Sequence, residues 1–335
     1  QFETTEGTET TFTPSLLLNY RPAENIVARF HYDRTTTNQD FRQIRRNRQV
    51  FIDLRDSQNR VILREANPDL RPTTVDNFEI DLSYYFRDSP GIVRAGFFYK
   101  NVQNNFTNVL FQDGGDESVR DDVIDYFGDL ATQLPEIVAF DANTEFLRNR
   151  PENGEGGTIY GFEAEVIRQL DFLPGFLSDF GVLGNVTYTT ADFPTLMSGR
   201  NDDGTLGQFV LGRPLEDQAA WVYNASLNYQ RGGFEGRAIY TYQDATPDTY
   251  EVHGLDIIKP SYSTLDIRLS YRLPTRFADL TFYLQGDDLL RGSTEADLRS
   301  ATSSMFNDGP ADFYFPDNYQ FNGGRTITLG ARVSF

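Results

Sequence analysis

The final segment of the chain alternates apolar side chains with polar or small ones. The apolar set is Ile327, Leu329, Ala331, Val333 and Phe335. A repeat of two residues is typical of a β-strand with one apolar face. Such a strand ending on an aromatic residue is expected as the closing strand of an outer-membrane β-barrel. A soluble sheet over an apolar core has the same alternation, so the spacing of further strands must decide.

The alternation recurs along the whole chain. In 265–273, leucine, isoleucine and tyrosine side chains face one way, whereas Asp266, Arg268, Ser270 and Arg272 face the other. Eleven such segments predict eleven strands, each with one apolar and one polar face. Their approximate bounds are 11–20, 25–37, 73–87, 91–106, 157–170, 178–191, 216–230, 233–245, 261–273, 278–288 and 324–335.

The connections between these segments alternate between short and long. Compact soluble domains rarely contain connections beyond about 12–15 residues, whereas outer-membrane barrels have short periplasmic turns and long extracellular loops. The pattern therefore predicts an all-β fold, a transmembrane antiparallel β-barrel whose last strand ends in the periplasm. The short connections are 21–24, 88–90, 171–177, 231–232 and 274–277, and the long ones are 38–72, 107–156, 192–215, 246–260 and 289–323.

The number of strands predicts that the barrel is incomplete. Counted back from the periplasmic end, the first of eleven strands starts outside the cell. A bacterial barrel made of one chain has an even number of strands and both termini in the periplasm. Eleven is half of 22, the strand number of plugged outer-membrane transporters. Residues 1–335 are therefore expected to be the C-terminal half of a 22-stranded barrel, without the N-terminal plug domain and the first strands.

Composition and motifs exclude several classes of protein. No run approaches the roughly 18 consecutive apolar residues of a membrane helix, and the net charge of −19 argues against nucleic-acid binding. The chain has no cysteine and two histidines, His31 and His253. It contains no phosphate-binding loop and no Cys/His metal spacing. We therefore expect no enzyme, no cofactor and no metal site.

Several stretches resemble the β-barrels of TonB-dependent outer-membrane receptors. They occur in the family's order over most of 67–335. They are A-N-P-D-L-R-P-T-T-V-D-N-F-E-I-D-L-S-Y-Y-F (66–86), A-G-F-F-Y-K-N-V-Q-N-N-F (95–106), Y-G-F-E-A-E (160–165), F-L-P-G-F-L-S-D-F-G-V-L-G-N-V-T-Y-T (172–189) and the terminal G-G-R-T-I-T-L-G-A-R-V-S-F.

The resemblance implies a receptor in the outer membrane of a Gram-negative bacterium. Such a receptor binds a scarce nutrient (a ferric siderophore, an oligosaccharide or similar) with its extracellular loops. It imports the nutrient with energy from a TonB-type periplasmic partner, which acts through the N-terminal plug. Lipid and lipopolysaccharide surround the barrel, and other outer-membrane or surface proteins are further candidate partners. The alternative is an outer-membrane barrel that binds or holds partners and transports nothing.

Loop 107–156 is acidic, with 12 Asp and Glu residues against three Arg. Asp113, Asp116 and Asp121 are candidates for binding a cation or gating a cationic ligand complex, because hard cations take several carboxylate oxygens. The spacing matches no EF-hand loop, and a solvated surface loop is the commoner meaning of a charge run. Apolar residues from Val119 to Phe127 recur at helical spacing, which predicts a short helix in this loop.

Loop 38–72 begins with four arginines, Arg42, Arg45, Arg46 and Arg48. Arg45 and Arg46 are candidates for binding acidic sugars or lipid phosphates, since the guanidinium fork suits such anions. Pairing with the acidic loop is the alternative, and we favour it. The alternation on the two sides of Ser57-Gln58-Asn59 predicts a protruding hairpin.

Two further sets of candidate binding residues complete the sequence prediction. In the last long loop, Phe313 and Tyr314 either stack on sugar rings or aryl siderophores or join an interfacial aromatic girdle, to which Tyr319 and Phe321 are assigned. On the polar strand faces near the extracellular end, the candidates for ligand contact in the lumen are Gln243, Asp266 and Gln285.

Overall fold

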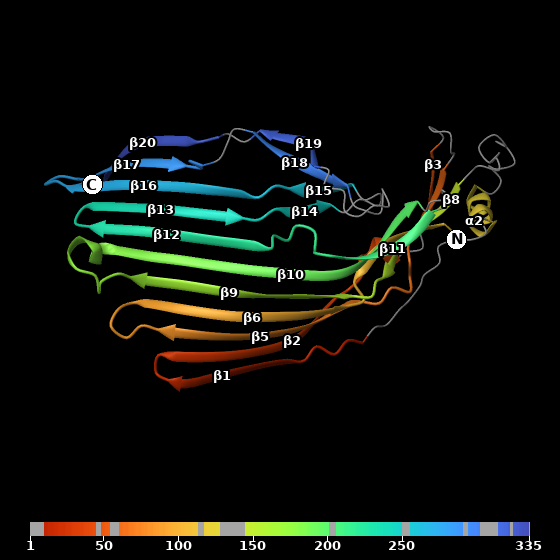
Figure 1. The fold of residues 1–335 in the computed structure, drawn as a ribbon, viewed down its shortest axis with the longest axis horizontal. Helices are drawn as coiled ribbons and strands as arrows, with labels where there is room; N and C mark the ends of the chain where they lie inside the picture. Colours follow the sequence, from red (N-terminus) through yellow and green to blue (C-terminus); the bar gives the residue numbers. More distant parts are fainter. Residues whose placement is uncertain are drawn as a thin grey trace.

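Eleven long strands form one antiparallel sheet, in the order in which they occur along the chain (Figure 1). The computed structural model describes residues 10–44, 48–53, 60–112, 117–127, 145–200, 206–249, 255–290, 294–301, 314–321 and 324–334. All eleven predicted strands are present, which confirms the all-β prediction. They are β1 (Ser15–Ala23), β2 (Ile26–Thr37), β5 (Thr73–Tyr85), β6 (Gly91–Gln103), β9 (Gly157–Gln169), β10 (Phe180–Arg200), β12 (Trp221–Arg231), β13 (Phe234–Gln243), β16 (Tyr262–Pro274), β17 (Asp279–Asp287) and β20 (Thr326–Ser334).

The short connections all lie at one end of this sheet. Two of them have only two residues, Glu24-Asn25 between β1 and β2 and Gly232-Gly233 between β12 and β13, where Gly232 has φ +59°. The favoured two-residue hairpin turns use such left-handed backbone, which glycine adopts without strain. The longest short connection holds a turn of 3₁₀ helix, η1 (Gly175–Asp179). Ser334 pairs with Asp279, the first residue after the turn between β16 and β17. The chain therefore ends at the short-turn end, as predicted.

One face of the sheet, here named the outer face, is apolar and exposed. Leu269 on β16 pairs with Gly236 and Leu284, and Leu284 pairs with Leu329 on β20. Leu329 is 81% exposed and Ile327 is 73% exposed. A soluble monomer rarely exposes so large an apolar surface to water, whereas lipid chains can cover it at no cost.

Aromatic side chains mark the two margins of the outer face. Toward the long loops, Tyr188 lies 4.7 Å from Trp221 between ring centroids. Toward the short turns, Phe180 lies 4.7 Å from Tyr229. From Trp221 to Tyr229 the strand advances about 27 Å, or roughly 20 Å along the membrane normal at the usual barrel tilt. This spacing suits an apolar band flanked by two aromatic girdles.

The opposite, inner face is polar and carries ion pairs between strands. Asp81 on β5 accepts a hydrogen bond from Arg29 of β2 (3.1 Å) and lies 3.6 Å from Nε of Arg94 on β6. His31 also lies on this face, with Nδ1 3.6 Å from Asp33 and 3.9 Å from Glu79. The inner face has the charge and hydrogen bonding of a wetted lumen.

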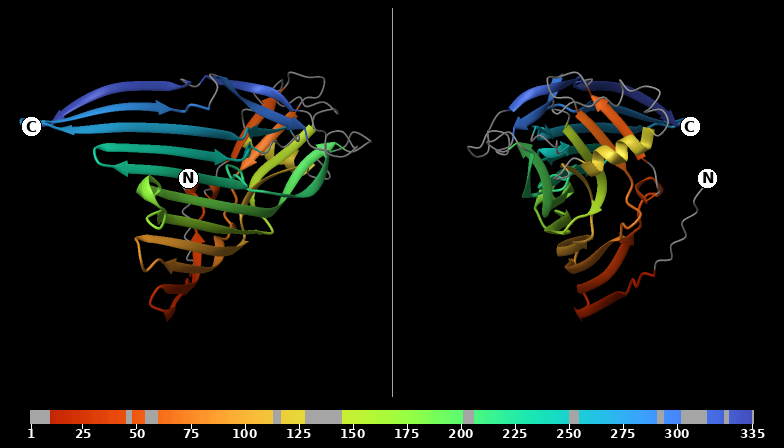
Figure 2. Two further views of the ribbon diagram at one scale, coloured as in Figure 1. Left: turned by 60° about the vertical axis from the view of Figure 1, so that its left-hand side comes forward. Right: turned by 90° about the vertical axis from the view of Figure 1, so that its right-hand side faces the viewer.

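The sheet is an open arc and not a closed ring (Figure 2). Strands β1 and β20 are its two ends and do not pair with each other. Unpaired strand edges of this length are a liability in water or lipid, because their N–H and C=O groups need partners. None of the helices among the described residues is long and apolar enough to cross a membrane.

The long connections contain strands beyond the eleven, and of these the sequence pattern predicted only the hairpin around Ser57-Gln58-Asn59. β3 (Arg48–Asp53), β4 (Arg60–Glu65), β8 (Glu145–Asn153) and β7 (Phe106–Gln112) form one four-stranded sheet, here named the loop sheet. A second four-stranded sheet is made by β14 (Thr246–Thr249), β15 (Leu255–Lys259), β18 (Thr294–Ala301) and β19 (Tyr314–Phe321).

Two elements predicted in these connections are present. The hairpin is confirmed as β3 and β4, and the short helix as α2 (Glu117–Phe127); a further helical turn, α1, spans Phe41–Ile44. The boundary of the strand expected at 178–191 was wrong. β10 continues to Arg200, because β11 (Leu206–Arg213) pairs with its outer part.

Candidate ligand-binding site

The loop sheet joins two long connections into one folded unit. β4 from loop 38–72 pairs in parallel with β8 from loop 107–156. Helix α2 covers one face of the sheet, here named the helix face. Its Val123 is fully buried against Val61 and Leu63 of β4 and Phe146 of β8. The rows of alternating side chains make this face apolar, and the helix excludes water from it.

Arginines at the margin of the helix face are paired with carboxylates. Arg148 donates a hydrogen bond to Asp122 of α2 (2.7 Å) and another to Glu65 of β4. Arg48 lies 3.5 Å from Asp122 and 3.6 Å from Glu65. Partial burial works to lower the pKa of the Arg148 guanidinium, but its hydrogen bonds to Glu65 and Asp122 outweigh that effect and raise the pKa. These pairs confirm that the basic and acidic loops bind each other, although through Arg48 and Asp122.

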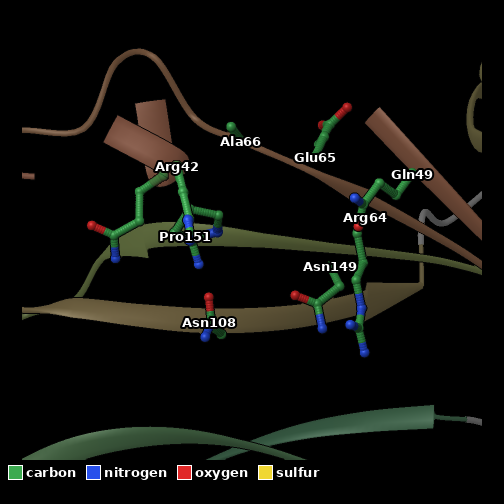
Figure 3. A pocket seen from close by; sticks show the side chains of 9 residues that line it. Arg42, Gln49, Arg64, Glu65, Ala66, Asn108, Asn149 and Pro151 are labelled. Atoms are coloured by element: carbon green, nitrogen blue, oxygen red, sulfur yellow. The ribbon is translucent and has the colours of Figure 1, made fainter. Parts of the chain in front are cut away.

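The other face of the loop sheet, here named the polar face, borders a cavity of about 390 Å³ (Figure 3). Arg64 of β4 pairs in register with Gln49 of β3 and with Asn149 of β8. Figure 3 shows the side chains of Arg64 and Asn149 extending to the same side, while Glu65 points away. The polar lining also includes Asn108 of β7, Arg42 and Gln43 of α1, and Glu65, whose carboxylate is paired with Arg148.

The charge on the polar face is not neutralised by the part of the chain that the structure describes. No carboxylate among the described residues forms an ion pair with Arg42 or Arg64, and the Arg64 guanidinium lies 4.5 Å from the centroid of the Phe51 ring. Two guanidinium groups and four carboxamides offer many N–H donors beside an aromatic ring. Such a lining suits an anionic, oxygen-rich ligand with a planar or ring-shaped part.

The predicted loop residues are only partly within the described chain. Asp121 lies on α2 and is exposed, with no ion pair to the described residues; its neighbour Asp122 makes the pairing contacts. Tyr314 is the first residue of β19, opposite Ser300. The remaining loop candidates, which lie outside the described residues, are Arg45, Arg46, Asp113, Asp116 and Phe313.

Tyr319 and Phe321, which we assigned to the aromatic girdle, lie in a loop strand. Both residues belong to β19, which among the described residues pairs with β18 in the second loop sheet and not with the eleven-strand sheet, here named the membrane sheet. Pro316 and several polar residues interrupt the alternation in this segment, so a search for a two-residue repeat did not identify it as a strand.

The three lumen candidates share the inner face on neighbouring strands. Gln243 pairs in register with Tyr262 and accepts a hydrogen bond from its hydroxyl (3.0 Å). Asp266 accepts one from the backbone N–H of Asp288 (2.7 Å), and Gln285 donates one to Asp287 (2.8 Å). Each side chain therefore has a local partner, and the three do not converge on one point. No group of metal-ligating side chains occurs among the described residues.

Sequence reasoning missed the polar face as a site. The alternation in 60–64 places Arg64 opposite Val61 and Leu63, and the predicted hairpin brings Gln49 beside it. Asn149 and Asn108 come from a distant segment through the parallel pairing of β4 with β8. No local pattern in the sequence indicates that pairing.

An antiparallel sheet with turns at one end, long loops at the other and two aromatic margins defines the class of transmembrane β-barrels of outer membranes. The sequence matches the family described as TonB dependent receptor-like, beta-barrel, over residues 1–289. The chain belongs to this family, as its motifs led us to expect. The family is one of transporters rather than enzymes.

Solved structures of siderophore receptors share the fold. The ferric enterobactin receptor PfeA of Pseudomonas aeruginosa is 15% identical; 96% of this chain and 40% of that chain align, with a TM-score of 0.55. The siderophore receptor PirA of Acinetobacter baumannii is 13% identical, with 96% and 41% aligned and a TM-score of 0.55. No curated protein matches the sequence. The chain spans about two fifths of the length of these receptors.

Proposed function

We propose that the chain is the C-terminal half of a receptor barrel in the outer membrane of a Gram-negative bacterium. The receptor captures an anionic small nutrient, a ferric siderophore or a similar acidic ligand such as an oligosaccharide, at the polar face of the loop sheet. A TonB-type partner then drives import through the plug. Lipid surrounds the outer face, and lipopolysaccharide lies at the long-loop end.

The observation that carries the capture site is the cavity beside Arg42 and Arg64. These guanidinium groups lack an ionic partner among the described residues, whereas those of Arg48 and Arg148 on the helix face are paired. A guanidinium group set among amides and facing solvent keeps its capacity for bidentate bonds to carboxylate, catecholate or phosphate oxygens. Two structural neighbours are named as ferric enterobactin and siderophore receptors, which agrees with such a ligand.

The capture site is tested by ligand binding to intact cells that display the receptor. Replacing Arg64 with Gln removes a charge-assisted hydrogen bond and should weaken binding about 10- to 100-fold. The control is Arg276→Gln, which removes the same charge from a short turn at the opposite end and should leave binding unchanged. Unchanged binding in Arg64→Gln, with the protein at the surface, would move the site to the inner face around Gln243, Asp266 and Gln285.

Import is tested separately from capture. If the protein is a TonB-driven transporter, uptake of labelled ligand should stop when the proton-motive force is collapsed, while surface binding persists. A barrel that only binds or holds partners would show binding with no uptake under either condition. This outcome would favour the non-transporting alternative.

We also propose that the missing barrel half lies between β20 and β1. Eleven strands in an open arc, and a chain that spans about two fifths of comparable receptors, both support this arrangement. The coding sequence upstream should encode a plug followed by eleven further alternating segments. An upstream sequence without such segments would contradict the proposal.

A further inference from the structure

The outer face carries an apolar groove between the two aromatic margins. A cavity of about 440 Å³ crosses the face from β9 to β16. Register pairs place Val166, Gly184, Ala225, Tyr240 and Leu265 in one row on this face. Small side chains in this row and at Ala238 in the next row leave the depression.

The small residues are not required by the backbone. A Cβ atom built on Gly184 would meet Val166 Cγ1 at 3.6 Å, an ordinary van der Waals distance, and Gly184 is not among the residues with positive φ. A larger side chain would therefore fit at this position. Elsewhere the same face carries bulky residues such as Phe97, Leu269 and Leu284. The groove is a local departure from a bulky lipid-facing surface.

An arginine lies at the short-turn end of the groove. Arg168 of β9 pairs in register with Val182, which lines the groove, so Arg168 is on the outer face. Its guanidinium carbon lies 4.1 Å from the centroid of the Phe86 ring and 5.6 Å from that of Phe172. An arginine on a lipid-facing surface is costly unless its charge reaches the headgroup level.

The hydrogen-bonding capacity of Arg168 is largely unused by the protein. Its Nη2 lies 3.6 Å from the Asp171 carboxylate, an ion pair beyond hydrogen-bond length, and its Nη1 has no hydrogen-bond partner among the described residues. Phe172, which shields the guanidinium, is exposed, and exposed side chains change rotamer rapidly. The guanidinium is thus positioned to bind an oxyanion when the ring rotates.

We infer that this part of the outer face is a specific binding site for one phospholipid of the periplasmic leaflet. An acyl chain lies in the groove, and the phosphate binds the Arg168 guanidinium. The Asp171 carboxylate, which is also exposed, is an acceptor for the ammonium of an ethanolamine headgroup. An apolar groove with a cation at the headgroup level matches the two chemical parts of a phospholipid. The site goes beyond nutrient uptake and does not depend on it.

The first test counts the phospholipids that remain on the full-length protein after extraction in mild detergent, by native mass spectrometry. The unchanged protein should retain one phospholipid. Ala225→Leu, which fills the groove, and Arg168→Gln, which removes the phosphate contact, should each retain none. Gly184→Ala narrows the groove with less change in volume and serves if Ala225→Leu fails to fold.

The matched controls are Ala95→Leu and Arg272→Gln. Ala95 lies on the outer face but does not line the groove, and Arg272 is a short-turn-end arginine on the inner face, paired with Asp279. Both controls should keep the lipid. Retention by the Arg168 and Ala225 variants equal to that of the controls would overturn the site, and so would loss in all four variants.

The second test adds lipids to delipidated protein and measures the thermal midpoint, because a ligand that binds the folded state raises it. Phosphatidylethanolamine should raise the midpoint of the unchanged protein but not that of Arg168→Gln. Diacylglycerol, which lacks the phosphate, should raise neither. An equal shift with diacylglycerol would show that the groove takes any acyl chain and would refute the role of Arg168.

Discussion

The membrane sheet and the loop sheet are built on the same alternation and differ in what covers the apolar face. In the membrane sheet that face is bare, and Leu329 is 81% exposed. In the loop sheet it lies under α2, and Val61 and Leu63 are 0% exposed. Both sheets carry arginines on the opposite face, which is the inner face of the membrane sheet and the polar face of the loop sheet. The loop sheet therefore has an apolar core of its own, whereas the apolar face of the membrane sheet is left for lipid to cover.

The difference shows what period two does and does not specify. Alternation fixes which side chains share a face, because successive residues of a strand point to opposite sides. It does not say whether lipid, a helix or water meets that face. In this chain the arrangement of turns and loops distinguishes the membrane sheet, and the helical spacing in 117–127 supplies the cover of the loop sheet.

The largest expected effect comes from the same substitution made in the two sheets. Leu63→Ala removes a buried side chain under α2 and should destabilise the loop sheet by about 2–5 kcal/mol. Leu269→Ala on the outer face should cost far less, since lipid chains are as apolar as leucine and fill the space. Hydrogen exchange of β4 and β16 in the reconstituted protein measures both. An equal loss of exchange protection in the two variants would contradict the assignment of Leu63 to a buried core and Leu269 to a lipid-facing surface.

A charge on the bare face is expected to have the next largest effect. Leu269→Arg should destabilise the barrel by about 2–4 kcal/mol if the residue lies near the bilayer midplane. Arg268→Leu should be mild, because Arg268 is on the inner face directly opposite Arg237, and like charges across a pair are unfavourable. Folding titrations in liposomes compare the two variants. An equal loss of stability would mean that the two faces are exchanged.

The paired arginines of the helix face provide a smaller effect. Glu65→Gln removes the carboxylate shared by Arg48 and Arg148 and should loosen the loop sheet by about 1–3 kcal/mol. The membrane sheet should not respond. Protease cleavage within the loop sheet, with the barrel strands as internal reference, measures the change. Gln49→Glu, which adds a carboxylate beside Arg64 on the polar face, serves as the comparison and should instead reduce ligand binding.

The membrane sheet was predictable from sequence because lipid imposes one rule on all its strands. Every segment from 11–20 to 324–335 has to present an apolar row to lipid. The short turns determine which strand pairs with the next one. The facing of Gln243, Asp266 and Gln285 followed from the same rule and agrees with the register. What remained hidden were their hydrogen-bond partners, which depend on side-chain geometry.

The loop sheets were less predictable because their strands pair across long stretches of chain. β4 pairs with β8, which starts 80 residues beyond the end of β4, and β15 pairs with β18 across a membrane hairpin. Proline and charged residues interrupt their alternation, as in Pro151 of β8 and Pro316 of β19. The cavity beside Arg64 arises from such pairing, so residue types alone pointed to Arg45 and Arg46.

The smallest expected effect concerns an ion pair that ties the second loop sheet to the chain before β12. Lys259 at the end of β15 bonds Asp248 of β14 and lies 3.0 Å from Asp217. These hydrogen bonds, first Asp248 and then Asp217, raise the pKa of Lys259. A cation whose pKa is raised by folding stabilises the fold fully below the pKa of unfolded lysine, about 10.4, and progressively less as the pH rises above it.

Lys259→Met should therefore lower the thermal midpoint of the loop region by the same small amount from pH 7 to about pH 10. The difference from the unchanged protein should shrink at higher pH, as the unchanged protein loses the pair too. Lys259 and Asp217 are both solvent-exposed, so the pair contributes a few tenths of a kcal/mol and less in high salt. Calorimetry across this pH range at low and high salt measures it. A difference in thermal midpoint that grows above pH 10.4 would contradict the stabilising role of the Lys259 ion pair. Deprotonation of Lys259 at high pH can only remove this stabilisation.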